Sequence, residues 1–457
     1  MSRIRYYPEL ILLLIGSVFT RTWHIFQPNA VVFDEVYFKA FAGHYLDGHY
    51  FFDIHPPLGK LLLAGWAHIC GINASTLANT ASLPLRVVPA LFGIALVPIV
   101  WAIIRLLGGS RRSAFLGGFL ILLDNALIVE SRFILTDTIL LATGLGAILC
   151  YLIARRFSTN FYYFWLTSSA LLAGASFSTK WTGLTALTLV ILIWFYDSRS
   201  YFYTAKWFGQ FAILILVPLS LYVTLFAVHF ALLPNSGEGD AFMSARFQST
   251  LIGNTNYSPL AKMSFPAKFV ELNQEMYQAN KTLTATHPYG SHWYSWPLEL
   301  RPIYYWQGDA QSDGKQGNIY LLGNPAIWWG TLVATICGLI IYFRRGALRK
   351  SRNTKGIALI LIAYFINYLP FAAVTRVMFL YHYFFSLIFE IILAVLLWDF
   401  IAIRLEKTKS NIRLLKVLYI VILAVVALSF IYFAPLTYGS PLSPKGISNH
   451  LWIPSWR

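Results

Sequence analysis

The chain has 457 residues, of which 57% are hydrophobic and 12% are charged, with a mean hydropathy of +0.60. Soluble domains carry about 25% charged residues, so this composition argues against a soluble protein with an ordinary polar surface. Many of the cations behind the formal net charge of +16 cluster between apolar blocks. That arrangement is typical of membrane topology and argues against nucleic-acid binding.

The apolar blocks predict a polytopic membrane protein. Each is roughly 18 to 22 residues long, the length that crosses a bilayer core, and together they predict an all-α fold with about eleven transmembrane helices. In chain order we expect these spans at 7–26, 85–107, 113–129, 134–154, 161–177, 182–196, 208–232, 319–343, 356–374, 379–401 and 414–434. The first span follows a short basic N-terminus with no small-residue cleavage site, so we expect it to be retained rather than removed as a signal.

Two segments are too polar to span. The first outer loop, 27–84, contains apolar-periodic stretches at 34–46 and 57–69, which predict amphipathic helices at the membrane surface. The second segment is rich in Asn, Gly, Ser, Trp and Tyr and predicts a large extracytoplasmic loop. The chain is thereby divided into an N-terminal transmembrane catalytic module, the large loop, and a C-terminal four-span module with an outer tail, at 1–232, 233–318 and 319–457.

Basic clusters predict the orientation of the chain. They lie near 105–112, 155–156, 344–355 and 404–416, in connections that the positive-inside rule assigns to the cytoplasm. The N-terminus is then cytoplasmic, and the C-terminus and both polar segments are extracytoplasmic. We therefore expect an active site on the outer face.

Two adjacent carboxylates, Asp34 and Glu35, open the first outer loop. A carboxylate at this position can take a proton from a hydroxyl nucleophile. His55 and Lys60 follow beside the lipid phase, where cations can hold a lipid-linked phosphate and stabilise charge as it leaves. The alternative is that Asp34 and Glu35 cap a surface helix.

Other ionisable residues lie near the ends of the predicted spans. Lys180 and Arg376 are on the outer side and are candidates for binding a phosphate, with snorkelling as the alternative. Arg132 and Asp137 lie five positions apart near the outer end of a helical hairpin. Because an intramembrane charge needs a partner, we expect these two to form a structural pair.

The large loop concentrates aromatic and basic side chains, notably His287, Trp293, Trp296 and Arg301. Aromatic rings stack on the faces of sugars, which makes these residues candidates for acceptor or sugar binding. The alternative is an aromatic belt at the membrane surface. The histidines and the three cysteines lack metal-ligand or disulfide-framework spacing, so we expect no metal site.

Segments spread along the chain resemble the motifs of one enzyme family. In order, they are Phe33-Asp34-Glu35-Val36-Tyr37-Phe38, Asp53-Ile54-His55-Pro56-Pro57-Leu58-Gly59-Lys60, Asp124-Asn125-Ala126-Leu127, Ser131-Arg132-Phe133-Ile134-Leu135, Ser178-Thr179-Lys180-Trp181-Thr182-Gly183-Leu184, His287-Pro288-Tyr289-Gly290-Ser291 and Tyr381-His382-Tyr383. Together they resemble the dolichyl-phosphate-mannose protein mannosyltransferase family, over residues 32–385.

The resemblance implies the GT-C glycosyltransferase fold. It also implies inverting transfer of mannose from a polyprenyl-phosphate donor to Ser or Thr of secreted or membrane proteins, with the lipid-linked sugar as substrate and no certain cofactor. Asp34 would be the base, and Glu35 its neighbour in acceptor binding. The resemblance further assigns Arg86 to the donor phosphate, with a snorkelling arginine as the alternative, and Asp53 is grouped with the acceptor- or sugar-binding residues.

The large loop departs from the eukaryotic pattern. Eukaryotic members carry a β-trefoil insert there, whereas this loop has only about 85 residues and no run of strand-like repeats, typical of a prokaryotic-type member. We expect a multi-pass protein of the plasma (inner) membrane that contacts membrane lipids, its lipid-linked donor and an acceptor protein during secretion.

Two other functions fit parts of the sequence. A GT-C enzyme acting on a lipid or glycan would share the first-loop acid and the cations. A membrane transporter would instead place charges or broken helices along a central path, often with repeated halves. No internal repeat is evident, and most charges lie near span ends.

Overall fold

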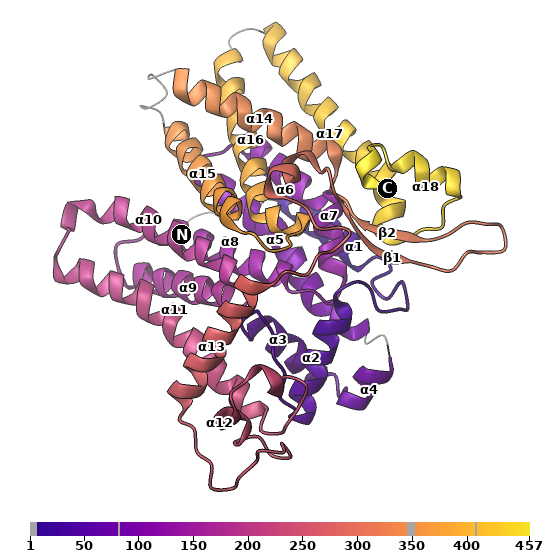
Figure 1. Cartoon of the computed structure of the whole chain (residues 1–457). Coiled ribbons are helices and arrows are strands. Elements are labelled where there is room, and N and C mark those ends of the chain that lie inside the picture. The colour runs from indigo at the N-terminus through magenta and orange to yellow at the C-terminus, as the bar shows by residue number, and fades with distance from the viewer. Residues whose placement is uncertain (1–6, 81–82, 345–351, 407–408) are drawn as a thin grey trace.

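The computed structural model describes residues 7–80, 83–344, 352–406 and 409–457 (Figure 1). Part of the basic clusters at 344–355 and 404–416 lies outside these residues. The regular elements described in the N-terminal half are helices. Its main helices are α1 (Pro8–Thr22), α2 (Glu35–Asp47), α3 (Leu58–Ile69), α4 (Ala74–Asn79), α5 (Val87–Leu106), α6 (Arg111–Leu122), α7 (Asn125–Arg132), α8 (Asp137–Ala154), α9 (Asn160–Phe177), α10 (Leu184–Ser198) and α11 (Ala205–Leu232).

The two helices α2 and α3 confirm the amphipathic segments predicted in the first outer loop. Gly48 ends α2 in the left-handed conformation, φ 80°, which glycine adopts without a Cβ penalty. Asn73 caps α4, because its side chain accepts a hydrogen bond from the Thr76 amide. The first loop is therefore a folded layer rather than an irregular connection.

The large outer loop contains helices and one hairpin. Its elements are α12 (Ala245–Gln248), α13 (Phe265–Thr282), the 3-10 helix η5 (Trp293–Leu298), β1 (Ile303–Gln307) and β2 (Asn318–Leu321). The antiparallel pair of β1 and β2 is the one sheet among the described residues, which fits the expectation that this loop holds no β-trefoil. In Figure 1 the hairpin projects from one side of the molecule and α12 lies at the bottom.

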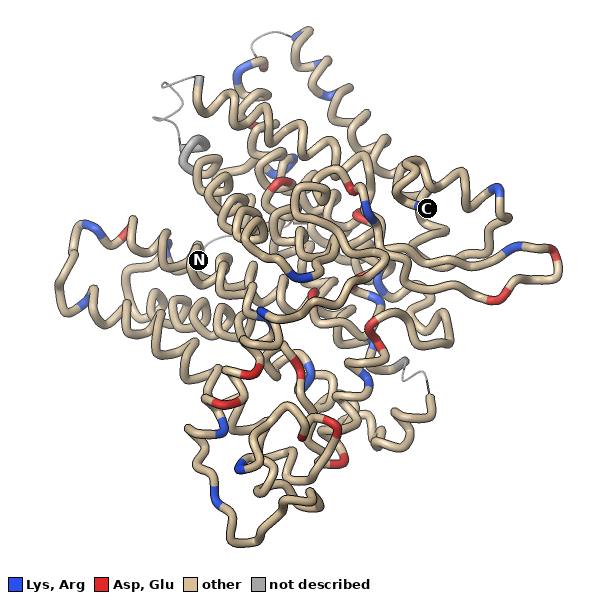
Figure 2. The backbone as a smooth tube through the Cα atoms, viewed as in Figure 1, with Lys and Arg blue, Asp and Glu red and all other residues tan. Residues whose placement is uncertain are grey.

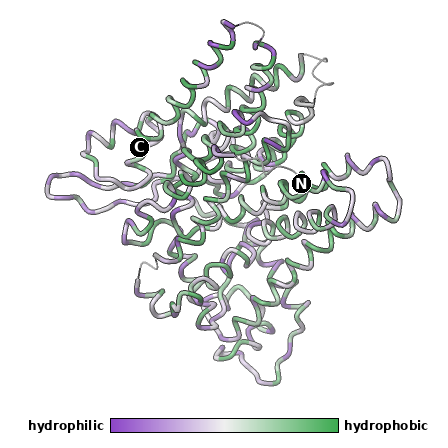
Figure 3. The backbone as a smooth tube through the Cα atoms, turned by 180° about the vertical axis from the view of Figure 1, so that it is seen from behind, coloured by the Kyte–Doolittle hydropathy of each residue, from purple (hydrophilic) through white to green (hydrophobic). Residues whose placement is uncertain are grey.

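The C-terminal part adds a second group of long helices. They are α14 (Pro325–Arg344), α15 (Arg352–Tyr368), α16 (Phe384–Leu405) and α17 (Lys409–Tyr438), followed by the short α18 (Pro444–His450). Helix α16 is the central one, because almost every residue from Phe384 to Leu397 is buried. Figure 3 shows hydrophobic residues along the long helices and hydrophilic residues in connections and the hairpin. Figure 2 shows Lys and Arg mostly at helix ends and in connections.

Eight helices among the described residues are long and apolar enough to cross a membrane, or nine if a bent pair counts as one span. This number is smaller than the eleven or so predicted. Helix α1 has only 15 residues, and α9 carries several Tyr, Ser and Thr residues. The expected span at 113–129 is broken by 56° between α6 and α7. The break follows from Asp124, which caps α7 by accepting from the Leu127 amide and also accepts from the Trp328 indole.

Candidate active site

Glu35 and Arg86 form a buried ion pair that anchors the first outer loop. Both side chains are 0% exposed, and the guanidinium makes two hydrogen bonds of 2.7 Å to the two carboxylate oxygens. The remaining guanidinium N–H groups donate to the carbonyls of Ile25, Pro28 and Ala30. All five donors are therefore used, which leaves none for a phosphate and corrects the phosphate-binding role expected for Arg86.

The same geometry changes the expected role of Glu35. Its carboxylate also accepts hydrogen bonds from the backbone amides of Val32 and Ile134. With both oxygens occupied and no exposed surface, Glu35 cannot contact an acceptor. The acceptor-binding role expected for it is corrected to one of holding the neighbouring residue in place.

Asp34 presents the opposite environment. It is the residue before α2, but its side chain makes no capping hydrogen bond, and among the described residues its carboxylate has no hydrogen-bond or ion-pair partner. Phe33, one position earlier, has a left-handed backbone, φ 47°, which is strained for a residue with a Cβ. Burial raises the pKa of Asp34 to about 6, an effect that Lys180 partly offsets. Asp34 is therefore a free carboxylate with the pKa of a general base.

Lys60 is bound to Asp53 in the next part of the loop. The Lys60 ammonium donates to the Asp53 carboxylate and, at 2.6 Å, to the carbonyl of His55. Its side chain is 3% exposed, so Lys60 shapes the turn rather than reaching a phosphate, and that expectation is corrected. Gly59 permits this packing, since a Cβ there would lie 2.6 Å from the Thr136 methyl group. Asp53 is 13% exposed and accepts from Lys60 through one carboxylate oxygen, and its expected acceptor or sugar contact stays a prediction.

Asp137 pairs with Lys180 and not with Arg132. The Lys180 ammonium lies 2.6 Å from the Asp137 carboxylate. Arg132 instead donates to the carbonyls of Trp23 and His24 and lies over the Tyr438 ring. The expected pair of Arg132 with Asp137 is therefore wrong. At the N-terminal end of α8 the acid faces the segment before α10, whereas Arg132 ends α7 and points to the end of α1.

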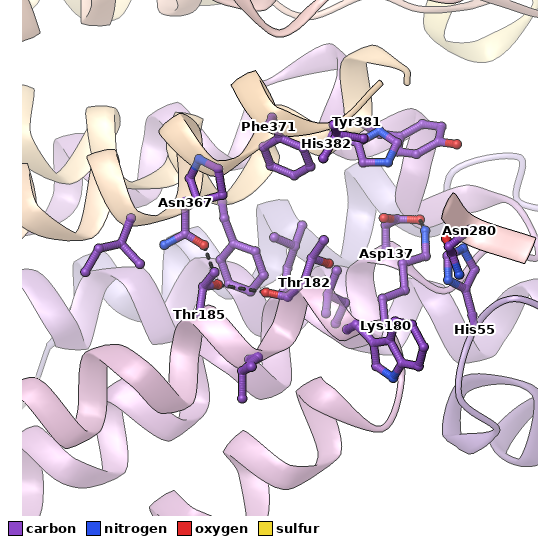
Figure 4. A pocket seen from close by; sticks show the side chains of 18 of the residues that line it. His55, Asp137, Lys180, Thr182, Thr185, Asn280, Asn367, Phe371, Tyr381 and His382 are labelled. Atoms are coloured by element: carbon purple, nitrogen blue, oxygen red, sulfur yellow. Dashed lines mark hydrogen bonds and ion pairs between the residues drawn. The ribbon is translucent and has the colours of Figure 1, made fainter. Parts of the chain in front are cut away.

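A cavity of about 460 Å³ opens beside these residues. Figure 4 shows His55, Asp137, Lys180, Asn280 and Tyr381 gathered at one part of it, with Thr185 and Asn367 in another. The rest of the wall is mainly apolar and comes from α8, α10, α15, α16 and the connection between α15 and α16. These wall residues include Leu140, Leu141, Leu184, Ile366, Pro370, Phe371, Val374 and Phe385. The cavity thus joins a polar end to an apolar channel between helices that can cross a membrane.

The polar end carries one cation that is not neutralised. Arg376 lines the cavity, is half-buried, and has no carboxylate partner among the described residues. His55 also lines the cavity, and burial together with the nearby cations Lys180 and Lys60 holds its pKa well below the ordinary value. His55 is therefore a neutral hydrogen-bonding group near pH 7, and its expected part as a cation is corrected.

Asp34 lies near this polar end, because the preceding Phe33 contacts Phe379 at 6.4 Å between ring centroids and Phe379 stacks on the cavity residue Tyr381 at 5.4 Å. The charges of Lys180 and Asp137, which line the cavity, both act on its pKa, as does the charge of Asp53. Burial raises the pKa of Tyr305, a residue of β1, and the negative charge of Asp34 adds to that shift. A base candidate and a cationic end of a membrane cavity therefore share one site.

The residues expected in the large loop have different places. Trp296 is 0% exposed, donates to Ser291 and stacks behind the His382 ring at 5.9 Å, so its expected sugar contact is corrected. Arg301 donates to the carbonyls of Pro288 and Ser455 and ties the loop to the C-terminal tail. Trp293 packs on Tyr368. His287 is exposed and lies 6.2 Å, ring to ring, from Phe33, and so remains beside the site.

Several site residues escaped the sequence analysis. His382 and Tyr381, which belong to the Tyr381-His382-Tyr383 motif, line the cavity, and Asn280 reaches it from α13. The Asn280 amide donates to the carbonyl of Ile54, which ties α13 to the first loop. A His and a Tyr directly before an apolar span were a usable signal for the first two. Nothing local distinguishes Asn280 from other polar residues of the loop.

The fold and the site define a polytopic membrane protein with a polar site at one end of a mainly apolar cavity. Two family profiles match nearly the whole chain. "Dolichyl-phosphate-mannose-protein mannosyltransferase" matches residues 11–234, and "C-terminal four TMM region of protein-O-mannosyltransferase" matches residues 265–456. The chain belongs to the dolichyl-phosphate-mannose-protein mannosyltransferase family.

Curated relatives agree with this assignment. Dolichyl-phosphate-mannose--protein mannosyltransferase 4 of Candida albicans is 33% identical over 349 residues, covering 70% of this chain and 44% of that protein. Protein O-mannosyl-transferase 2 of Danio rerio is 30% identical over 317 residues, covering 63% of this chain and 40% of that protein. The chain thus spans less than half the length of these relatives.

Solved structures share the fold. A chain of the protein O-mannosyltransferase Pmt1-Pmt2 complex of S. cerevisiae, bound to the sugar donor, has a TM-score of 0.89 and 19% identity, covering 100% of this chain and 93% of that chain. ArnT from Cupriavidus metallidurans, bound to undecaprenyl phosphate, has a TM-score of 0.55 and 14% identity, covering 94% of this chain and 76% of that chain. These similarities confirm the GT-C fold and a multi-pass membrane protein.

Proposed function

We propose that this protein transfers mannose from a polyprenyl-phosphate-mannose donor to Ser or Thr hydroxyls of proteins, with inversion at the anomeric carbon. One observation carries the proposal: the cavity that joins an apolar channel to the Arg376 and Lys180 cations lies beside the unpartnered carboxylate of Asp34. A lipid-linked sugar phosphate matches this arrangement, because it consists of an apolar chain, then an anionic phosphate and then a sugar.

The donor fits the cavity by chemistry. The apolar wall supplied by α8, α10, α15 and α16 suits an isoprenoid chain. Arg376 has no carboxylate partner among the described residues. It is therefore the primary phosphate ligand, because binding a phosphate would not require it to break an existing ion pair. Lys180 adds a second charge that it shares with Asp137, and His55, His382 and Asn280 supply neutral hydrogen-bonding groups.

The reaction is a single displacement. The acceptor hydroxyl oxygen forms a bond to the anomeric carbon of mannose while the bond from that carbon to the phosphate oxygen breaks. The hydroxyl proton passes to the Asp34 carboxylate, and the bonding electron pair leaves with the lipid phosphate. Arg376 and Lys180 stabilise the charge that develops on that phosphate.

The assignment of mannose as the sugar and of a protein as the acceptor is supported by the relatives and not by the cavity. The matched proteins are named as protein mannosyltransferases that use dolichyl-phosphate-mannose. His287, which lies beside Phe33, and Trp293, a large-loop residue that packs on Tyr368, are the residues we assign to the acceptor side. Acceptor transfer during secretion is part of the proposal.

We also propose the membrane topology of the chain and the part that each of its three segments plays in the reaction. The N-terminus is cytoplasmic, and the site, the large loop and the C-terminus are extracytoplasmic, in the plasma (inner) membrane. The cations at the helix ends remote from the cavity support this orientation. Residues 1–232 supply the base, 233–318 the acceptor face, and 319–457 the Arg376 side of the donor cavity.

The test is transfer by the purified full chain in detergent or nanodiscs. Polyprenyl-phosphate-mannose is supplied with a Ser/Thr peptide, with the same peptide carrying Ala at those positions, and with a lipid acceptor in place of peptide. We expect a one-hexose mass increase on the Ser/Thr peptide alone. Transfer to the lipid instead of the peptide would overturn the acceptor assignment, and failure to bind or consume the donor would overturn the proposed function itself.

A further inference from the structure

Tyr305 leaves the regular ladder of the hairpin. In the antiparallel pair of β1 and β2, Tyr304 pairs with Tyr320 and Trp306 pairs with Ile319, so Tyr305 is an extra residue with no partner opposite it. A bulge of this kind turns one side chain in a new direction and is often found beside active sites. Tyr305 is 5% exposed, so its side chain points inward rather than to solvent.

Two contacts account for where the Tyr305 side chain points. Its hydroxyl donates a 2.8 Å hydrogen bond to Glu130, a carboxylate on α7 that is 1% exposed. Its ring stacks face to face on Phe33, with centroids 4.4 Å apart and an interplanar angle of 8°. The bond to Glu130 fixes the ring, and the ring covers the residue immediately before Asp34.

The covered residue is the strained one. Phe33 holds a left-handed backbone, φ 47°, which costs of order 1–3 kcal/mol and persists only where surrounding contacts impose it. On the other side of Asp34, Glu35 is fixed by Arg86. The direction of the Asp34 carboxylate is therefore set from both neighbours, by the ion pair at Glu35 and by the ring stack at Phe33.

We infer that Tyr305 and Glu130 are positioning residues for the reaction: the outer-loop hairpin, anchored at Glu130, presses Tyr305 onto Phe33 and so holds Asp34 in its working direction. This inference rests on the proposed function. It assigns a role to Glu130, a fully buried acid that takes no direct part in the proposed displacement. It also couples the large loop, from which the acceptor approaches, to the base in the first loop.

The charged groups that face Asp34 come from several elements. They are Lys180 before α10, Asp137 at the start of α8, and Asp53 in the first loop. The titratable hydroxyls of Tyr305 and Tyr381 face it from β1 and from the 3-10 turn that precedes α16. Substitutions at Tyr305 leave the three charges in place, so any change in the titration of Asp34 reports its exposure to water.

Four variants test the inference. Tyr305→Phe keeps the ring and removes the bond to Glu130, Tyr305→Ala removes both, and Glu130→Gln keeps an acceptor oxygen for Tyr305. Tyr304→Phe is the matched control. Tyr304 is on the same strand as Tyr305, and the variant loses its side-chain hydrogen bond to Asn318 on β2 without touching Phe33. For each we would measure kcat and donor KM of peptide mannosylation, and the titration of the Asp34 carboxyl by infrared difference against Asp34→Asn.

We expect kcat to fall about 100-fold in Tyr305→Ala, the cost of misplacing a catalytic group by about 1 Å. In Tyr305→Phe the ring stays on Phe33 but loses its bond to Glu130, so we expect a smaller fall of about tenfold, and donor KM should be unchanged in both variants. Tyr304→Phe should stay within about threefold of the parent, whereas Glu130→Gln, which keeps an acceptor oxygen but loses the carboxylate, should lower kcat by less than Tyr305→Phe does. In Tyr305→Ala the Asp34 titration should move from near pH 6 toward the ordinary carboxyl range, since water reaches the carboxylate.

Two outcomes would overturn the inference. One is a folded Tyr305→Phe protein with parental kcat, which decides the matter even if Tyr305→Ala does not fold. The other is an unchanged Asp34 titration in a folded Tyr305→Ala protein. A parent protein that transfers no mannose would count against the proposed function, and the infrared titration, which needs no substrate, would still decide whether Tyr305 controls the environment of Asp34.

Discussion

Replacing Arg86 separates two accounts of this residue. In the structure Arg86 holds the Glu35 carboxylate in a buried ion pair and does not bind a phosphate. The substitution Arg86→Ala therefore leaves the Glu35 carboxylate, which is 0% exposed, without its cation. It also removes the hydrogen bonds to the carbonyls of Ile25, Pro28 and Ala30. Breaking a buried pair by removing one partner costs about 3–5 kcal/mol, so we expect a loss of that size in the free energy of unfolding.

The assay is denaturant unfolding of the purified protein in detergent, followed by tryptophan fluorescence. Arg111→Ala is the matched control, since Arg111 pairs with Glu9 at 2.5 Å but is 52% exposed, and such surface pairs contribute about 0–1 kcal/mol. The double variant Glu35→Gln/Arg86→Met, which removes both charges, should recover much of the loss. Parental stability of Arg86→Ala, accompanied by a donor KM raised tenfold or more, would refute this reasoning and restore the phosphate-binding account.

Three further predictions concern the cations and the base. Arg376→Gln should raise the donor KM about 10- to 100-fold without loss of stability, because it removes a charge-assisted bond but breaks no ion pair; an unchanged KM would exclude Arg376 from the donor site. Lys60→Met should lower the free energy of unfolding by about 3 kcal/mol, since it leaves Asp53 unpaired, and a variant as stable as the parent would contradict the loop-anchoring role. In a pH series, kcat/KM should fall about tenfold per unit below pH 6 and level off above it, because Asp34 must be deprotonated to accept the proton; a profile flat down to pH 4.5 would exclude this base.

The sequence was most informative where chemistry and local pattern coincide. Apolar length and periodicity predicted the helical membrane fold and the two helices α2 and α3, and the Asp34-Glu35 motif placed the base candidate in the first outer loop. Lys180 and Arg376, which lie 196 positions apart, were both expected at a phosphate site, and both line the cavity.

Partnerships between distant residues could not be predicted in the same way. Arg86 meets Glu35 across 51 positions, and Asp137 meets Lys180 across 43. Sequence proximity favoured Arg132 for Asp137, but the direction in which each helix end points decided otherwise. Tertiary packing decides which charged side chains form ion pairs with one another and which one stays free for a ligand. No local sequence pattern encodes that packing.

The same limit applies to the span count and to Tyr305. The bend between α6 and α7 depends on the contacts of Asp124 with Trp328, 204 positions away. The bulged residue Tyr305 donates its hydroxyl hydrogen bond to Glu130, 175 positions away. Neither a bent span nor a bulged strand leaves a periodicity signal of its own.

The central claim is that Asp34 is the base acting on a donor held in the adjacent cavity. It is tested most directly by single-turnover transfer from bound polyprenyl-phosphate-mannose to a Ser/Thr peptide in Asp34→Asn, with donor affinity measured on the same preparation. Asp47→Asn, at the exposed end of the same helix, is the control. The account predicts a rate about 10²- to 10⁴-fold below the parent with donor affinity nearly unchanged. A folded Asp34→Asn protein that transfers mannose at close to the parental rate would contradict it.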